Sequence, residues 1–328
     1  MKILALIPIS NAKSPARIYR GDGILERLDA EIDYFTQEHM AWDWSDWLKA
    51  SKKYDWLYVM RSAHIEHLNP CSMAKTFGIK IWYDLDDDYL AIEPDNTAFS
   101  AFQRQETRTA WQWFIKNADL RTYSTKPLLD KFGNGYLCQN ALDDKVFPMD
   151  IEYPNPKPGL FTWRGGGSHL KDLLEYAPTI NQFMEENPQI TMHMIGSIPP
   201  WFLSKNKNLK YTEYIPDYWF FMQNLRQIAP WGNIIPLSDC AFNRGKSNIA
   251  ALESVYAGAC PLVPNWEEWN LPGALKYDNH QQFIDGMRAL STMSPEEHKQ
   301  RWEANMKWIK ENRSLSVVNK KRMELLCQ

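Results

Sequence analysis

Cysteine is scarce in this sequence of 328 residues, and none of it forms the short C-x-x-C pair that is typical of metal sites. The cysteines are odd in number and far apart: Cys71, Cys138, Cys240, Cys260 and Cys327. This spacing argues against a zinc site and against a disulfide framework. We therefore expect a cytoplasmic protein, in a reducing compartment, whose site contains no metal.

The sequence also lacks an excess of positive charge and any long apolar run. The net charge is −3, so there is no general attraction to nucleic acid or to an anionic membrane. No run approaches the roughly 20 apolar residues of a membrane-spanning helix. The apolar start, Met1–Pro8, is too short for a signal peptide. We expect a soluble protein with no transmembrane segment, and contact with DNA would need a local basic patch.

The most informative stretch runs from Cys240 to Asn265. Its polar loop, Asn243–Asn248, leads into a helical pattern of apolar residues at Ile249, Leu252, Val255 and Tyr256. Ser247 or Asn248 can cap this helix, whose free N–H groups and positive dipole end then lie beside Lys246. Such a helix start is an anion site, and a phosphate is the simplest ligand for it.

The same helix carries one carboxylate, Glu253, one to two turns from its start. A carboxylate there can accept hydrogen bonds from the sugar hydroxyls of a nucleotide. Gly258 is expected to end the helix, and residues 259–264 are expected to form a short buried strand of a parallel sheet.

The run from Pro236 to Glu253, P-L-S-D-x-x-F-N-R-G-K-S-N-I-x-x-L-E, resembles the donor-site motif of GT-B glycosyltransferases, in particular the retaining family 4. The resemblance implies that the helix start, with Ser247 and Asn248, binds a nucleotide diphosphate and that Glu253 binds the ribose. Gly245 stands where the family has another glutamate, which handles the transferred sugar. Asp239 is the nearest acidic residue in sequence, and we expect it to take part in catalysis.

The first part of the chain alternates apolar strands with helical or loop stretches, which predicts a parallel sheet. Strands are expected at Lys2–Ile9, Ile32–Phe35, Trp56–Met60 and Ile79–Tyr83. Later in the chain, a strand is expected at Asn233–Leu237, and helices are expected at Pro295–Asn312 and Leu315–Leu326. The loop after the first strand carries Arg17 and Arg20, at the sheet edge where open α/β sheets bind ligands. These cations either face an anionic donor or acceptor or belong to a solvated loop.

The fourth strand ends in four carboxylates within five residues: Asp84, Asp86, Asp87 and Asp88. They must be solvated, paired or bound to a cation. One interpretation is a haloacid-dehalogenase-like phosphatase, which the segment resembles, with Asp84 as nucleophile, Asp86 as general acid and Mg²⁺ bound. In the glycosyltransferase interpretation Asp84, Asp86 and Asp87 lie on the acceptor side. Helix capping with solvated charge is a third possibility.

A second glycine loop follows the clearest linker, Tyr153–Gly159. A strand beginning at Phe161 ends in Arg164-Gly165-Gly166-Gly167-Ser168-His169, and a helix opens near Lys171. Glycines at such a turn let the backbone approach a phosphate, and Arg164 adds charge. We therefore assign Gly165, Gly166, Gly167 and His169 to the donor. Asn140, after an earlier short strand, is expected on the acceptor side.

Together these patterns predict an α/β protein of the GT-B class, with two Rossmann-like domains whose parallel sheets face a central cleft. Residues 1–155 would form the acceptor-side domain, 156–312 the donor domain, and the helix 313–328 would pack back on the first. The expected activity is sugar transfer from a nucleotide-diphosphate sugar, with no further cofactor, catalysed by Asp239, Lys246 and Arg164. The acceptor is left open between a glycan, a lipid, a protein and a modified DNA base. The alternatives are the phosphatase and a GT-B-like binding protein without turnover.

Overall fold

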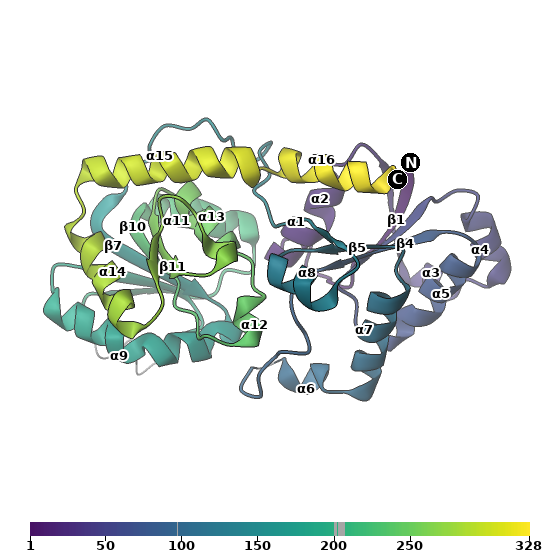
Figure 1. Ribbon diagram of the computed structural model, residues 1–328, viewed down its shortest axis with the longest axis horizontal. Coiled ribbons are helices and arrows are strands. Elements are labelled where there is room, and N and C mark those ends of the chain that lie inside the picture. Colours follow the sequence, from purple (N-terminus) through teal and green to yellow (C-terminus); the bar gives the residue numbers. More distant parts are fainter. Residues whose placement is uncertain (97, 200–201, 203–206) are drawn as a thin grey trace. The chain divides into compact units, whose positions relative to one another are not determined.

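The computed structural model describes residues 1–328 except 97, 200–201 and 203–206. The chain divides into two compact units: Figure 1 shows unit 1 in purple to teal together with the yellow C-terminal helix, and unit 2 in teal to yellow. Unit 1 contains Met1–Pro94, Ala98–Asn140 and Leu315–Gln328, and unit 2 contains Ala141–Ser314 with a short piece that begins at Asp95. Each unit has its own sheet.

The sheet of unit 1 has six parallel strands in the order β2-β1-β3-β4-β5-β6. Their bounds are β1 Lys2–Leu6, β2 Glu31–Tyr34, β3 Trp56–Met60, β4 Lys80–Leu85, β5 Leu120–Tyr123 and β6 Tyr136–Leu137. Every residue of β3 is buried, as expected for a central parallel strand covered on both faces. The strand order reverses between β1 and β3, where such sheets form ligand crevices.

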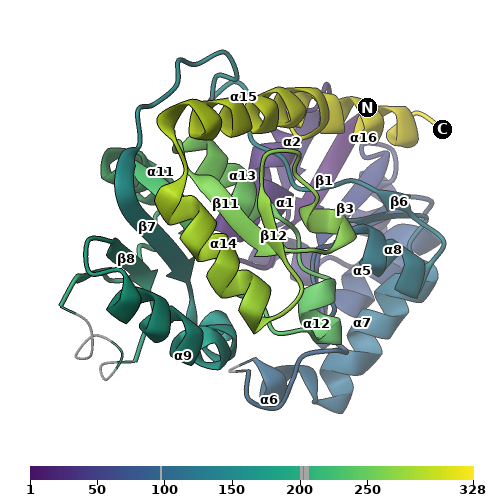
Figure 2. The same ribbon diagram turned by 60° about the vertical axis from the view of Figure 1, so that its left-hand side comes forward.

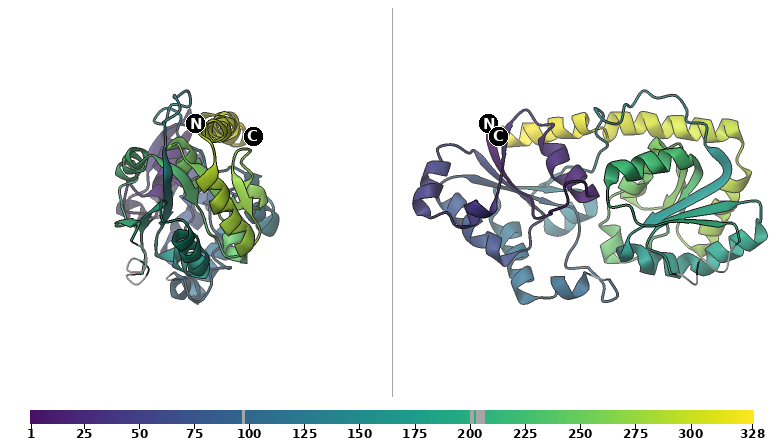
Figure 3. Two further views of the ribbon diagram at one scale, coloured as in Figure 1. Left: turned by 90° about the vertical axis from the view of Figure 1, so that its left-hand side faces the viewer. Right: turned by 180° about the vertical axis from the view of Figure 1, so that it is seen from behind.

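The helices of unit 1 are mostly short and come from both ends of the chain. They are α1 Pro15–Arg20, α2 Asp22–Leu25, α3 Gln37–Met40, α4 Trp44–Ala50, α5 Leu68–Thr76, α6 Phe99–Phe102, α7 Gln105–Asn117, α8 Lys126–Phe132 and α16 Leu315–Leu326. The C-terminal helix α16 is attached to this unit through Asn319, whose Nδ2 donates to the Ile24 carbonyl oxygen at 2.8 Å. Figure 3 shows both chain ends in this unit.

The sheet of unit 2 also has six parallel strands, in the order β12-β11-β10-β7-β8-β9. Their bounds are β7 Lys157–Gly165, β8 Thr191–Gly196, β9 Leu209–Thr212, β10 Pro230–Ile234, β11 Cys260–Pro264 and β12 Leu275–Tyr277. The chain starts in the middle at β7, moves outward to β9 and resumes on the other side at β10. The order therefore reverses between β7 and β10, as in a Rossmann sheet.

Helices cover this second sheet (Figure 2). They are α9 Leu170–Glu186, α11 Tyr218–Ile228, α12 Ala241–Arg244, α13 Ile249–Tyr256, α14 His280–Thr292 and α15 Pro295–Asn312. Helices α9 and α14 pack against each other, and α13 packs against α15. The buried rings of Phe161, Phe183 and Phe283 join β7, α9 and α14 in one apolar cluster.

Three expected elements agree with the structure residue by residue, whereas β1, β2, β4 and β10 have bounds other than those expected. The strand Trp56–Met60 and the helices Pro295–Asn312 and Leu315–Leu326 are confirmed. The strand expected at Asn233–Leu237 is wrong by three residues, since β10 is Pro230–Ile234. Ala229 ends α11 with a left-handed backbone (φ 52°), which releases the chain into a strand that starts with proline. Proline is tolerated at a first strand position because a donor is not required there.

Two further boundaries also differ from the sequence interpretation. The linker expected at Tyr153–Gly159 is shorter, because β7 already begins at Lys157. The loop expected at Asn243–Asn248 is partly helical, because α12 includes Asn243 and Arg244. Pairing of Lys157 with Pro230 of β10 extends β7, whereas α12 is closed by the local hydrogen bond from Arg244 N–H to the Cys240 carbonyl oxygen.

Candidate functional site

The candidate site of unit 2 lies at the carboxyl ends of β7 and β10, where the strand order reverses. After β7 the glycine loop passes through a short 3₁₀ turn, Gly167–His169, into α9. A Cβ atom added at Gly166 or Gly167 would meet no heavy atom within 4 Å. The backbone of these two glycines is therefore open to a close approach by a ligand.

Gly165 is required for a different reason, which is packing. A Cβ atom there would lie 2.6 Å from Cζ2 of Trp163 and 3.0 Å from Cβ of His169. On the neighbouring strand, Gly196 has φ +119°. A Cβ atom added there would lie only 2.0 Å from the Gly165 carbonyl oxygen. The ends of β7 and β8 can come this close only because both residues are glycine.

A hollow of about 400 Å³ lies beside this loop. It is lined by the start of α9 and by the chain after β8 and β9, namely Leu170, Gly196, Ser197, Ile198, Pro199, Tyr211, Glu213 and Tyr214. The sequence analysis did not single out these residues. The only local signal was that two tyrosines flank a glutamate at the end of an edge strand.

His169 is held by Asp172, three residues further along the start of α9. Its Nδ1 lies 3.2 Å from Oδ2 of Asp172. Burial lowers the pKa of His169, and the positive charges of Lys246 and Arg164 lower it further. Hydrogen bonds from Ser238 and Asn243 to Asp172 bring the segment before α13 to the start of α9.

Asp172 connects three segments of the site and was not expected from the sequence. Its Oδ1 accepts hydrogen bonds from the backbone N–H of Ser238 at 3.0 Å and from Nδ2 of Asn243 at 2.6 Å. Burial by itself would raise the pKa of Asp172, but the contacts with His169, Ser238 and Asn243 hold it below its usual value. The i, i+3 spacing from His169 was the available signal.

Lys246 has no carboxylate partner among the described residues, and its Nζ lies 4.4 Å from the ring centre of Phe242. Arg244, two residues earlier, is engaged instead by Asp239 through two hydrogen bonds of 2.7 and 2.8 Å. Both partners of that pair are exposed, and the Arg244 guanidinium lies over the ring of Trp266 at 4.6 Å. Of the two cations in this loop, Arg244 is therefore neutralised by a carboxylate and Lys246 is not.

Asn248 precedes the first residue of α13 but does not cap it with its side chain. The side chain is fully buried, and its Nδ2 donates to the Glu268 carbonyl oxygen at 2.7 Å. Asn248 thus ties the helix start to the segment after β11. Ser247 is half-buried beside it. A ligand at this helix start would meet backbone N–H groups and not the Asn248 amide.

Arg164 and Glu253 form an ion pair with each other. The side chain of Glu253 is 2% exposed and that of Arg164 is 24% exposed, and the guanidinium lies 5.4 Å from the ring centre of Phe221. The structure therefore brings two residues that the sequence assigned to the diphosphate and the ribose into direct contact. Much of the positive charge of Arg164 is balanced by this carboxylate.

In unit 1, Arg20 and Asp84 form a buried ion pair, with side chains 1% and 0% exposed. Nη1 of Arg20 also donates to the Cys138 carbonyl oxygen at 2.6 Å and lies 3.3 Å from Oδ1 of Asn140. Asp84 further accepts a hydrogen bond from Thr122. Arg20, Asp84 and Asn140, all expected on the acceptor side, thus hold α1, β4 and the chain after β6 together.

The remaining acceptor-side residues are paired but less buried. Asp86 lies 2.8 Å from Nη1 of Arg61, and Asp87 lies 3.9 Å from the same atom. Arg17 pairs with Asp22 and donates to the Ile9 carbonyl oxygen at 3.0 Å. Arg61, which the sequence analysis missed, follows β3 with φ 40°, a left-handed backbone that is uncommon for a residue other than glycine.

This arrangement does not favour the phosphatase interpretation. A nucleophilic carboxylate must contact the ester, whereas Asp84 is fully buried against a guanidinium. Within the part of the chain that the structure describes, no group of three or more His, Cys, Asp or Glu side chains is arranged to hold a metal ion. No described helix is both long and apolar enough to span a membrane.

No family model and no curated protein matches the chain, whereas several solved structures share its fold. A UDP-forming α,α-trehalose-phosphate synthase from Burkholderia xenovorans aligns over 100% of both chains with a TM-score of 0.66 at 10% identity. Alr3699/HepE of Anabaena, in complex with UDP and glucose, aligns over 100% of both chains with a TM-score of 0.66 at 13% identity.

An α-glucosyltransferase in complex with UDP and a 13-mer DNA also aligns over 100% of both chains, with a TM-score of 0.64 at 12% identity. These similarities concern the fold, because the identities are low. The resemblance to family 4 stays a prediction. With two six-stranded parallel α/β units and these structural neighbours, the chain has the GT-B fold.

Proposed function

We propose that this protein is a glycosyltransferase that uses a nucleotide-diphosphate sugar as donor. The observation that carries the proposal is that the start of α9, directly after the open glycines Gly166 and Gly167, meets the segment before α13 through the hydrogen bonds of Asp172. A lysine without a carboxylate partner beside open backbone N–H groups suits a diphosphate. The complexes of HepE and the α-glucosyltransferase with UDP make UDP the first nucleotide to test.

In this proposal the protein stabilises the diphosphate leaving group. Lys246 and the N–H groups of Gly166, Gly167, Ser247 and Asn248 supply fixed positive charge and dipoles where negative charge develops when the glycosidic bond breaks. Asp172 orients the His169 ring toward this task through Nδ1. No metal is needed for this mode of stabilisation, which uses only groups of the chain.

The rest of the nucleotide has suitable partners nearby. Glu253 is held in place by its ion pair with Arg164, and its carboxylate oxygens can accept hydrogen bonds from ribose hydroxyls. The hollow beside the glycine loop offers Tyr211 and Tyr214 as apolar rings and Glu213 as an acceptor for a base. We assign the nucleobase to this hollow.

The transferred sugar is assigned to the segment from Asp239 to Gly245. Gly245 has φ −80° and ψ −11°, a conformation that any residue can adopt, so the backbone does not require glycine there. Asp239 is the acidic residue we place against the sugar. On the acceptor side, Asp87 and Arg61 are half-buried and more accessible than the buried pair of Arg20 and Asp84.

A second candidate is a nucleotide-sugar binding protein without turnover. It is favoured by one observation: Gly245 has no carboxylate, and both oxygens of Asp239 are engaged by Arg244. The two candidates share the donor site and differ in whether the glycosidic bond is cleaved.

The test is a thermal-shift and calorimetric screen of UDP, GDP, ADP and dTDP, followed by the sugar donors of whichever nucleotide binds. We expect one diphosphate at 100 times its dissociation constant to add about 2.7 kcal/mol to the free energy of unfolding. Slow hydrolysis of the matching donor then identifies a transferase, and binding without hydrolysis or transfer identifies the second candidate. Absence of binding by all four diphosphates would overturn both.

A further inference from the structure

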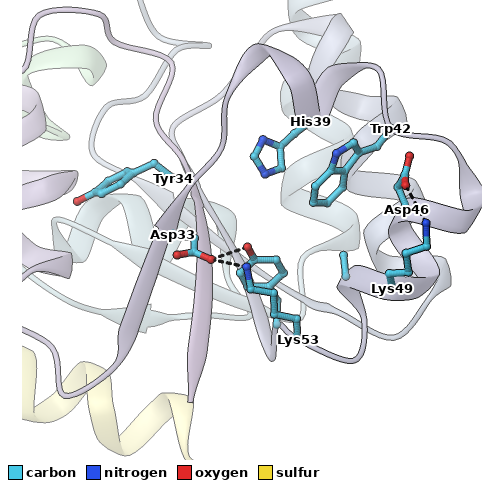
Figure 4. Close-up of a pocket in the computed structure, with 9 residues that line it drawn as sticks. Asp33, Tyr34, His39, Trp42, Asp46, Lys49 and Lys53 are labelled. Atoms are coloured by element: carbon cyan, nitrogen blue, oxygen red, sulfur yellow. Dashed lines mark hydrogen bonds and ion pairs between the residues drawn. The ribbon is translucent and has the colours of Figure 1, made fainter.

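Unit 1 contains a second hollow, of about 510 Å³, that the proposed donor and acceptor residues do not use (Figure 4). It lies between the edge strand β2 and the helices α3 and α4. It is lined by Asp33, Tyr34, His39, Trp42, Asp46, Lys49, Ala50, Lys53 and Tyr54. Its volume falls within the roughly 300–1,000 Å³ of ordinary small-ligand pockets.

One wall of this hollow consists of aromatic rings that are fixed from behind. The ring centres of His39 and Trp42 are 4.3 Å apart, and Trp42 meets the fully buried Trp47 edge-on at 5.0 Å. Phe35 lies behind His39 at 4.9 Å. The Tyr34 ring points away from Asp33 and from this wall (Figure 4). Trp42 and His39 therefore present a preorganised apolar surface to the hollow.

The opposite side carries an oriented hydrogen-bond acceptor, Asp33. Its Oδ2 meets the Tyr54 hydroxyl at 2.6 Å, Lys53 at 2.9 Å and Lys2 at 3.1 Å. Its Oδ1 has no protein partner among the described residues. The hydrogen bond from Tyr54, followed by that from Lys53, holds the pKa of Asp33 well below its usual range. Asp33 stays ionised and acts only as an acceptor.

His39 supplies a donor of known tautomer. The backbone N–H of Thr36 donates to its Nδ1 at 2.9 Å, so the neutral ring carries its hydrogen on Nε2. Burial lowers the pKa of His39, which favours this neutral form. Nε2 has no hydrogen-bond partner in the described part of the chain.

The charges that line the hollow cancel. Lys53 pairs with Asp33, and Lys49 lies 3.4 Å from Oδ1 of Asp46, so two cations face two carboxylates. Binding of a phosphate or a nucleic-acid backbone here would cost free energy, because the carboxylates of Asp33 and Asp46 repel its negative charge. A ligand without net charge avoids this cost.

We propose that this hollow binds a neutral saccharide. The C–H face of a pyranose is apolar and matches the face of Trp42, whose electron density attracts the ring hydrogens. The sugar hydroxyls donate to Oδ1 of Asp33 and accept from Nε2–H of His39. The hollow would act as an anchoring subsite for a glycan; that this glycan is the acceptor or product of the transferase rests on the proposed function.

The test measures binding of maltotriose, cellotriose and chitotriose to the full chain by titration calorimetry. We expect at least one trisaccharide to bind in the millimolar range or tighter. Trp42→Leu should weaken this binding by about tenfold, as the loss of one aromatic stacking contact does. The matched control is Trp44→Leu, because Trp44 lies on α4, is 63% exposed and does not line the hollow. It should bind like wild type.

Trp42→Phe keeps a ring against Trp47, so it provides a folded variant with an intermediate loss if Trp42→Leu is unstable. Failure of wild type to bind any of the three sugars would overturn the proposal, as would equal losses in Trp42→Leu and Trp44→Leu. Tighter binding of a sulfated heparin disaccharide than of the neutral sugars would overturn the assignment of a neutral ligand. UDP binding, measured in the same samples, should not change; its absence in wild type would count against the donor site and not against this hollow.

Discussion

The two parallel sheets carry charged residues at the same edge, their carboxyl ends, yet the two edges differ in how the charges are used. In unit 1 the carboxylates have cationic partners: Asp84 with Arg20, Asp86 with Arg61, and Asp88 with Lys131. In unit 2, Lys246 has no carboxylate partner within the described residues, and its charge lowers the pKa of His169 after the glycine loop.

A high density of charged residues in a sequence therefore does not by itself identify a ligand-binding site. The cluster Asp84–Asp88 is the most charged segment of the chain, but cations from α1, α8 and the end of β3 neutralise it. A ligand gains most where a charge has no protein partner, because no existing ion pair has to be broken. We therefore propose that the unit 2 edge is the one that binds a ligand, whereas the ion pairs of the unit 1 edge hold its own elements together.

The largest expected effect is on the buried pair of unit 1. Arg20→Met should lower the free energy of unfolding by about 3–5 kcal/mol, because it leaves the buried carboxylate of Asp84 unpaired. Urea denaturation measures this loss. The control is Lys126→Met, which removes an exposed pair with Asp130 and should cost less than about 1 kcal/mol. A similar small loss in both variants would contradict the structural role of Arg20.

The second-largest effect is expected on diphosphate binding when Lys246, the unpaired cation of unit 2, is removed. Lys246→Ala should weaken nucleotide diphosphate binding by roughly ten- to hundredfold, since a charged hydrogen bond to phosphate contributes about 1.5–3 kcal/mol. The stability of the free protein should stay within about 0.5 kcal/mol of wild type. Calorimetry of both proteins decides it. Arg244→Ala is the matched control, because Asp239 already engages that cation, and its effect on affinity should be small.

Two neighbouring glycines separate packing from binding within the unit 2 edge. Gly165→Ala should lower stability by about 1–3 kcal/mol, because its Cβ would overlap the Trp163 ring. Gly166→Ala, where the Cβ meets nothing within 4 Å, should leave stability within about 0.5 kcal/mol. Its methyl group should instead reduce diphosphate affinity. If Gly166→Ala bound the diphosphate as wild type does, this part of the loop would not contact it.

A smaller effect should appear in the pH dependence of binding. In the free protein the pKa of His169 is lowered by burial and by Lys246, so the ring is neutral at pH 7. A bound diphosphate is negative and raises this pKa, so the complex takes up protons. Affinity should therefore rise as the pH falls from 8 toward 6, by at most about tenfold per unit for one proton.

His169→Gln removes the titrating group and should flatten this slope, leaving only the titration of the phosphate itself. Calorimetry in buffers of different ionisation enthalpy counts the protons taken up by each protein. Equal proton uptake by wild type and variant would place His169 outside the site.

The smallest effect on binding is expected at Asp239. Asp239→Asn should slow sugar transfer or donor hydrolysis. The affinity for the diphosphate should stay within about threefold of wild type, which is less than the tenfold change that corresponds to 1.4 kcal/mol. Its pair with Arg244 is exposed, so little stability should be lost. Steady-state rates with the identified donor measure the effect. Full turnover in the variant would show that Asp239 does not replace the carboxylate that is missing at Gly245.

Local sequence patterns were enough to predict the two parallel sheets and the helix start at Lys246–Asn248. These features depend on local signals: continuous apolar strands, glycines at the ends of strands, and a polar loop before an amphipathic helix. These features can be predicted from the sequence because each depends on residues that are close together in the chain. The strand Trp56–Met60 and the two C-terminal helices are of this kind.

Which charged side chains are paired, and which are not, can be seen only in the tertiary structure. Asp84 meets Arg20 from 64 residues away, and Asp172 meets Ser238 and Asn243 from 66 and 71 residues away. The pairing of Arg164 with Glu253 spans 89 residues. Such contacts depend on strand order and on how helices pack on the sheet, which no local pattern encodes. For the same physical reason the hollow lined by Asp33, His39 and Trp42 became visible only when β2, α3 and α4 were in place.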